Sequence, residues 1–141
     1  MIGANDLLRC EETSKDGCLR PSEQQAVFRT VGSNVRHILS AIRDNARYRG
    51  QLAIVNYCSP VVGFNAFIVK LNRAVDAAAR PFRVVIAGGF GAFQAADRRS
   101  GRNPCTAGLL TQLGSPGKCG IHPSYAGQSL LAQALLKVTR L

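Results

Sequence analysis

Hydrophobic and polar residues alternate at three- and four-residue spacing over residues 21–47, which is the pattern of an amphipathic helix. The side chains of its apolar face are Val27, Val31, Val35, Ile38, Leu39, Ile42 and Ala46. Pro21 suits the first position of a helix and Gly50 follows a basic last turn, so one long helix is predicted here. His37 falls near the polar face, where a solvent-facing residue is expected rather than a ligand.

Two short apolar runs follow, at residues 52–57 and 83–87, and both are rich in β-branched residues like strands buried on two faces. The residues between them, 65–80, form a second helical stripe that begins at the plausible N-cap Asn65. Its apolar members are Ile68, Leu71, Val75 and Ala78. Strand, helix and strand in this order predict a right-handed βαβ unit with parallel strands, so we expect an α/β chain with helices covering a parallel sheet.

The last part of the chain combines a loop-rich segment with one more helix. Residues 88–120 are rich in Gly, Arg and Pro, and we expect loop there with at most a short helix. A final helix is predicted over about residues 124–139, with a buried face of Gly127, Leu130, Leu131, Ala134, Leu135 and Val138. No linker-like composition divides the 141 residues, so one domain is expected.

The composition, 46% hydrophobic, is that of a soluble globular protein. No apolar run approaches the roughly 18 residues that cross a bilayer, so no transmembrane segment is expected. Residues 1–6 have neither the basic start nor the apolar stretch of a signal peptide.

The formal net charge of +10 raises the question of a nucleic-acid partner, because Lys and Arg contact phosphates. The basic residues are mostly scattered singly, with small groups only at residues 47–49 and 98–102, and no aromatic residues are interleaved to stack on bases. This distribution favours a solvated basic surface over a nucleic-acid site.

The five cysteines suggest two local disulfides, Cys10 with Cys18 and Cys105 with Cys119. Neither pair has the spacing or the histidine partners of a zinc site, and short disulfide loops are typical of proteins from oxidising compartments. Cys58 lies alone in an apolar segment and is most simply a small buried hydrophobe. Five reduced thiols in a cytosolic protein remain the alternative.

Two short segments at opposite ends of the chain stand out, Gly-Ala-Asn-Asp at residues 3–6 and His-Pro-Ser at residues 122–124. Each alone could be an ordinary turn or a helix entry. In this order, with an α/β pattern between them, they resemble the third and fifth sequence blocks of the SGNH (GDSL-like) hydrolase family. Residues 56–60 (NYCSP) resemble a strand-end motif of that family and residues 121–132 resemble its histidine block, so the resemblance covers nearly the whole chain.

The resemblance implies a three-layer α/β/α parallel sheet of the SGNH-hydrolase (flavodoxin-like) type. It also implies hydrolysis of carboxylic esters, as by an esterase or lipase, through a serine nucleophile. His122 would be the general base and then the general acid, Asn5 would donate its amide to the oxyanion, and Asp6 would bond the loop backbone. Asn5 and His122 should then lie at the carboxyl ends of strands and face one crevice.

The resemblance further implies a small-molecule or lipid ester as substrate, with no cofactor, no metal and no nucleic-acid partner. The paired cysteines fit secreted members of the family, so an extracellular location is expected. The complete protein is expected to be a monomer.

The chain departs from the family pattern in two places. The serine block and the glycine that donates a second oxyanion N–H lie upstream of the GxND block in the family, and neither is present here. We therefore interpret residues 1–141 as the C-terminal part of a single SGNH-type domain, N-terminally truncated and inactive alone, because Ser33, Ser59, Ser100 and Ser129 do not sit in a strand-to-helix elbow. The acid that usually stands two or three residues before the histidine is also missing.

Gly120 and Cys119 occupy the positions of that acid. His122 would have to be oriented by a backbone carbonyl or by a distant acid such as Asp97. Two other hypotheses stay open: a non-catalytic relative or inactive fragment that acts as a binding module, and a basic nucleic-acid-binding domain.

Overall fold

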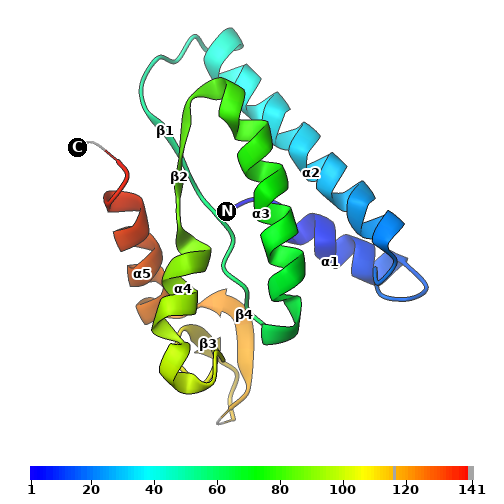
Figure 1. Ribbon diagram of the computed structural model, residues 1–141, viewed down its shortest axis with the longest axis vertical. Coiled ribbons are helices and arrows are strands. Elements are labelled where there is room, and N and C mark those ends of the chain that lie inside the picture. Colours follow the sequence, from blue (N-terminus) through cyan, green and yellow to red (C-terminus); the bar gives the residue numbers. More distant parts are fainter. Residues whose placement is uncertain (116, 140–141) are drawn as a thin grey trace. The chain divides into compact units, whose positions relative to one another are not determined.

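The computed structural model of the chain describes residues 1–115 and 117–139 (Figure 1). Within these residues the protein is mixed α/β, with five α-helices and two separate two-stranded sheets. The chain divides into two compact units: unit 1 comprises Met1–Leu52 and Lys70–Val84, and unit 2 comprises Ala53–Val69 and Val85–Leu141. No helix among the described residues is both long and apolar enough to span a membrane.

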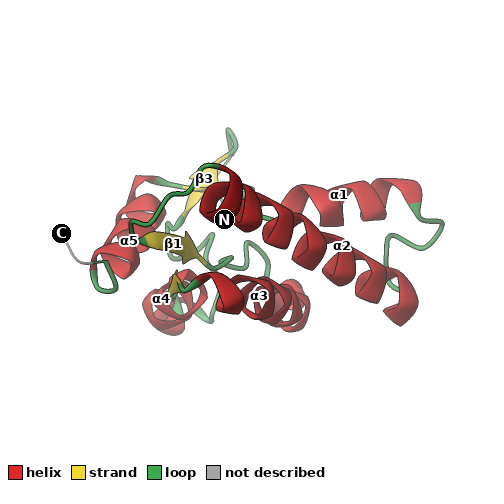
Figure 2. Cartoon of the chain, turned by 90° about the horizontal axis from the view of Figure 1, so that it is seen from above, coloured by secondary structure: helices red, strands yellow, loops and turns green. Residues whose placement is uncertain are grey.

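Unit 1 is built on helices. Helix α1 (Ala4–Thr13) lies beside helix α2 (Pro21–Ser40), which continues into one π-helical turn at Ala41–Asn45 (Figure 2). The predicted long helix is confirmed, with Pro21 in its first turn. The buried side chains of this unit include Val27, Val31, Val35, Leu39, Leu71, Val75, Ala78 and Ala79. Ile38 is 45% exposed, although the pattern placed it on the apolar face, because the buried stripe of α2 follows a four-residue spacing that ends at Leu39.

The predicted strand–helix–strand unit is present. Strands β1 (Leu52–Val55) and β2 (Val84–Ala87) pair with each other, and helix α3 (Asn65–Ala79) connects them. Both strands run in the same direction in Figure 1. The backbone N–H of Asn56 donates to the carbonyl oxygen of Ala87 at 3.0 Å and extends the pairing past the end of β1.

The rest of unit 2 contains helix α4 (Gly89–Ala96), strands β3 (Leu110–Gln112) and β4 (Cys119–Pro123), and helix α5 (Tyr125–Leu136). Helices α4 and α5 contact each other. The core of this unit is Cys58, Phe93, Leu109 and Leu110, with Leu130 and Leu131 packed against it. The predicted final helix is therefore confirmed, whereas the segment expected to be mostly loop also holds an antiparallel hairpin.

The prediction of a three-layer α/β/α parallel sheet of SGNH-hydrolase (flavodoxin-like) type is wrong for this chain. The parallel part consists of β1 and β2 alone among the described residues. Strands β3 and β4 form their own sheet and are joined by a short turn closed by the N–H of Leu113 and the carbonyl of Lys118, 2.8 Å apart. So short a connection permits only antiparallel pairing, because a parallel crossover needs a dozen or more residues.

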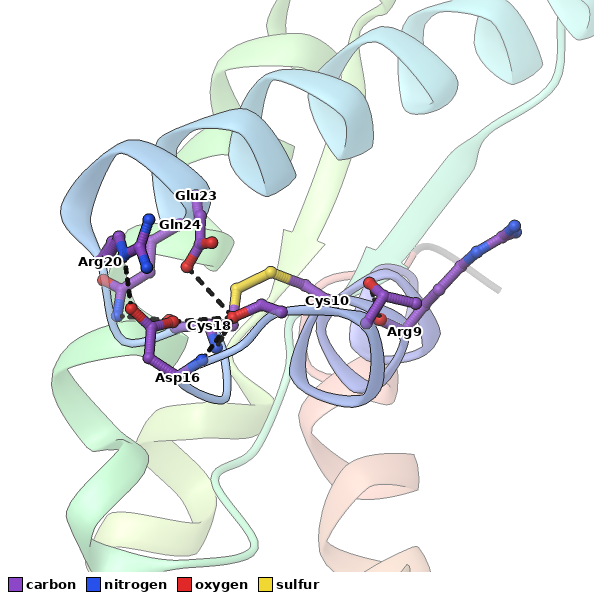
Figure 3. Close-up of a disulfide and its surroundings, with 9 residues drawn as sticks. Arg9, Cys10, Asp16, Cys18, Arg20, Glu23 and Gln24 are labelled. Atoms are coloured by element: carbon purple, nitrogen blue, oxygen red, sulfur yellow. Dashed lines mark hydrogen bonds and ion pairs between the residues drawn. A yellow bond between two sulfur atoms is a disulfide. The ribbon is translucent and has the colours of Figure 1, made fainter.

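Both predicted disulfides are confirmed, Cys10–Cys18 and Cys105–Cys119, and Cys58 is a buried free thiol. The first ties the end of α1 to the segment before α2 (Figure 3). The hydroxyl of Ser14 organises this loop, since it accepts from the N–H of Cys18 at 2.8 Å and donates to Asp16 at 2.7 Å. Burial raises the pKa of the Cys58 thiol to about 11, so the free cysteine is held as the neutral thiol.

Candidate active site

His122 lies on a bulged strand. The hairpin pairs Leu110 with Pro123 and Gln112 with Cys119, so β3 contributes one intervening residue whereas β4 contributes three. His122 is one of these three and is exposed to solvent. Extra residues in one strand bend it and redirect side chains, and such bulges are frequent beside active sites. The irregular register therefore places an exposed His122 outside the regular ladder.

The bulge is anchored at both ends. On one side, Cys119 is bonded to Cys105. On the other, Ser124 donates its backbone N–H to Leu109 O at 2.9 Å and its hydroxyl to Gly108 O at 2.6 Å. The same hydroxyl caps α5 by accepting from the N–H of Gly127 at 3.3 Å. His122 therefore stands between two fixed points on a short stretch of backbone.

Gly127 is required by the close approach of α5 to the hairpin and α4. A Cβ at this position would collide with the carbonyl oxygen of Leu109 and would lie 3.0 Å from the Phe93 ring and 3.1 Å from Pro123. The small residue thus lets the first turn of α5 sit directly against the strand that leads to His122.

No acid orients the imidazole. In the part of the chain that the structure describes, the His122 side chain makes no hydrogen bond or ion pair, and Gly120 and Cys119 precede it where the family has its acid. Asp97 is the only Asp or Glu in the sequence of unit 2. It is 1% exposed at the end of α4 and does not bond to His122, so the expectation that it could orient the histidine finds no support.

Asp97 instead closes the end of α4. Its carbonyl accepts from the N–H groups of Ser100 and Arg102 at 2.9 and 3.0 Å. Its buried Oδ1 has no hydrogen-bond partner among the described residues. Burial raises the pKa of this carboxyl, and the charge of Arg102 opposes that rise.

Asn5 lies in the first turn of α1 and is exposed. The Gly-Ala-Asn-Asp segment therefore opens helix α1, with Gly3 at the N-cap position. Gly3 makes this start possible: its φ of 112° suits only glycine, and a Cβ there would lie 3.0 Å from both Val31 and Leu71. The Asp6 carboxylate makes no hydrogen bond among the described residues, so its expected bond to the loop backbone is absent there.

Asn5 belongs to unit 1 and His122 to unit 2. Their convergence on one crevice stays a prediction.

None of the serines considered from the sequence pairs with His122 among the described residues. Ser59 is 4% exposed and donates its hydroxyl to Val61 O at 2.7 Å. Ser33 lies on the exposed side of α2, Ser100 in a 3-10 turn (Arg98–Ser100) and Ser129 on α5. Each therefore has a place in the fold that does not make it a nucleophile for this histidine.

Asn56, which belongs to the predicted strand-end motif, has a structural role. Its Oδ1 accepts from the N–H of Phe90 at 2.9 Å, so a side chain from the end of β1 caps the first turn of α4. Gly89 lets the two elements approach, because a Cβ there would lie 2.7 Å from Asn56 O and 2.8 Å from Leu131. The consecutive Gly88 and Gly89 at the start of α4 are the sequence signal that could have indicated this contact.

An apolar cavity of about 400 Å³ borders the bulge. Gly120 and Ile121, which directly precede His122, form part of its wall together with Pro60, Val61, Leu110 and the Cys105–Cys119 disulfide. A hydrophobic group could lie here beside the histidine.

Comparison with known proteins gives no relative: no protein-family model, no curated protein and no solved structure matches the chain.

Proposed function

We propose that this chain provides the general base and one oxyanion donor for the hydrolysis of carboxylic esters by a serine nucleophile. The observation that carries the proposal is the exposed His122 on an anchored β-bulge, within a sequence block that resembles the histidine block of the SGNH hydrolases. A catalytic base must be accessible to substrate yet held in place, and the disulfide on one side and the α5 cap on the other supply that support.

In the proposed reaction, His122 takes the proton of a serine hydroxyl as the hydroxyl oxygen bonds to the ester carbonyl carbon. It then gives that proton to the departing alcohol. Water repeats the sequence on the acyl-serine and releases the acid. The Asn5 amide donates a hydrogen bond to the carbonyl oxygen while it carries negative charge. The proposal requires a serine from outside residues 1–141.

The apolar wall of Pro60, Val61 and Ile121 next to the bulge supports a small-molecule or lipid ester as substrate. The two disulfides are compatible with an oxidising compartment. We propose an extracellular location for this activity.

One observation favours a second function, a binding module without catalysis. A histidine without a partner on its other ring nitrogen is free to rotate and to change tautomer, and in a serine protease the wrong tautomer costs about 10⁴ in kcat. Among the described residues His122 has no such partner. A non-catalytic relative would need only the cavity beside it.

The test begins with the reading frame upstream of the Met1 codon. The in-frame extension that carries a Gly-Asp-Ser block is joined to residues 1–141, and the protein is purified from an oxidising compartment and assayed with p-nitrophenyl butyrate. We expect His122→Ala to lower turnover by about 10³-fold or more and Asn5→Ala by about 10²- to 10³-fold. Residues 1–141 alone should give no turnover above their own His122→Ala variant.

His37→Ala is the matched control, because His37 is the other histidine of the chain and is exposed on α2. It should keep full activity. An upstream frame without the serine block, or equal activity of His122→Ala and His37→Ala, would contradict the esterase proposal and favour the binding module.

A further inference from the structure

A cavity in unit 1 is lined by arginines that the proposed ester chemistry does not use. It measures about 480 Å³ and lies between the π-helical end of α2 with the loop after it and the 3-10 turn before β2. Its lining residues are Arg43, Asp44, Arg49, Pro81, Phe82 and Arg83. Three arginines and one aspartate therefore line this space, with a formal net charge of +2.

Arg43 is fixed across the cavity wall. Its Nε donates to Phe82 O at 3.2 Å, and one of its Nη atoms donates to Tyr48 O at 3.0 Å and to Gly50 O at 2.7 Å. Its guanidinium also lies over the Tyr48 ring, 5.9 Å from the centroid. All three acceptors are neutral carbonyls, so the group is held in position while its positive charge is not cancelled.

The other charged residues of the cavity form no ion pair among the described residues either. Among the described residues the structure forms a single ion pair, Arg20 with Asp16, far along the chain from this site. Neither Arg49 nor Arg83 therefore has a carboxylate partner there. The Asp44 carboxylate accepts from the Ser40 hydroxyl at 2.8 Å and does not neutralise an arginine.

One lining residue of the cavity, Arg83, has an unusual backbone conformation. Arg83 has a φ of 52°. Glycine or asparagine is the usual residue in this left-handed region, and other residues there cluster at ligand-binding and active sites. The backbone conformation at position 83 therefore does not explain why an arginine stands there.

We propose that this cavity binds the phosphate or sulfate group of a small molecule. Guanidinium groups without a carboxylate partner, of which Arg43 is held in place, match the oxygens of a tetrahedral anion with paired N–H donors. Pro81 and Phe82 offer an apolar wall to the organic part of the molecule. This site is independent of His122, which lies in the other unit.

The test uses the disulfide-intact chain and isothermal titration with inorganic phosphate and with sulfate. Arg49→Gln and Arg83→Gly should each raise the Kd for phosphate by about tenfold, the effect of losing one charge-assisted contact. Arg83→Gly separates binding from folding, because glycine relieves the positive φ: its thermal midpoint should equal or exceed that of the wild type. Asp44→Asn should lower the Kd, since it removes the one repulsive charge of the lining and an amide oxygen can still accept from Ser40.

Arg29→Gln is the control, because Arg29 is exposed on α2 and its loss changes the net charge equally. It should leave the Kd unchanged. Sedimentation with phosphatidic-acid vesicles distinguishes the sources of the group: co-sedimentation that is lost in Arg49→Gln assigns a lipid headgroup, and phosphate binding without co-sedimentation assigns a soluble ester. Wild-type affinity in both arginine variants, or equal weakening by Arg29→Gln, would overturn the proposal.

Discussion

The contact between β1 and α4 can be tested at two glycines of one helix. A Cβ at Gly89 would lie 2.7 Å from the backbone oxygen of Asn56, 2.8 Å from Leu131 and 2.9 Å from Val55, whereas a Cβ at Gly91 would meet nothing within 4 Å. The atom that blocks position 89 belongs to the backbone of Asn56, whose N–H bonds to β2 and whose side chain caps α4. It cannot move without loosening both bonds.

We expect Gly89→Ala to lower the free energy of unfolding by roughly 1–3 kcal/mol, the usual cost of forcing a methyl group into a packed site. Gly91→Ala should raise it by about 0.5–1 kcal/mol, because alanine loses less backbone entropy than glycine in a helix. Urea unfolding followed by far-ultraviolet circular dichroism measures both values, with an unchanged m-value as the sign that the two unfolded states are alike. Equal stabilisation by the two alanines would refute the close approach of α4 to the end of β1.

Three further predictions concern the cap of α4, the cysteines and the buried carboxyl of Asp97. Asn56→Ala should lower the free energy of unfolding by about 1 kcal/mol through loss of the α4 cap, measured by urea unfolding, and Asn56→Asp should retain most of the wild-type stability. An alanine variant as stable as the wild type would show that Asn56 does not stabilise α4. Thiol titration should find one thiol per chain, that of Cys58. It should react slowly in the folded protein at pH 8, because burial raises the pKa of Cys58 to about 11, and fast after unfolding. Five thiols would contradict both disulfides. Burial raises the pKa of Asp97 above its value in the unfolded chain, so the native state binds this proton more tightly. The free energy of unfolding should therefore fall as the pH rises from the unfolded pKa of this carboxyl to its folded pKa. Unfolding curves of Asp97→Asn should lack this component, and an identical pH dependence in the two proteins would refute the assignment.

Local periodicity predicted the elements whose residues lie on one buried face. The four-residue spacing of Val27, Val31, Val35 and Leu39 appears directly as the buried side of α2, and Pro21 lies in its first turn as expected. The two β-branched runs became β1 and β2. The expected burial on both faces is wrong, since most residues of the two strands are half-buried and Ala53 is exposed.

The features that the sequence did not reveal depend on contacts distant along the chain. The β3–β4 hairpin contains few β-branched residues, and its formation is tied to the Cys105–Cys119 bond and to the seating of Ser124 on Gly108. The start of α1 at Ala4 depends on Gly3 packing against Leu71, a residue far along the chain. The parallel three-layer sheet was expected from a family resemblance, and the pairing of strands contradicts it.

For the candidate site, the sequence indicated Asn5 and His122, and the structure shows the local backbone that holds His122. The bulge that exposes His122 could not be seen from Gly120 and Ile121, since an irregular register has no periodicity. The missing acid was visible from the sequence, and the described residues provide no replacement.

The most direct test of the ester-hydrolase account is whether Asn5 and His122 can face the same substrate carbonyl. Native cysteines interfere little, because four are in disulfides and Cys58 is buried, so Asn5→Cys and His122→Cys introduce two accessible thiols. A short bifunctional maleimide should bridge them within one chain, detected as a single cross-linked mass and one linked peptide pair. The account predicts near-complete cross-linking of the double variant, and separate modification of both thiols with no bridged peptide would contradict it.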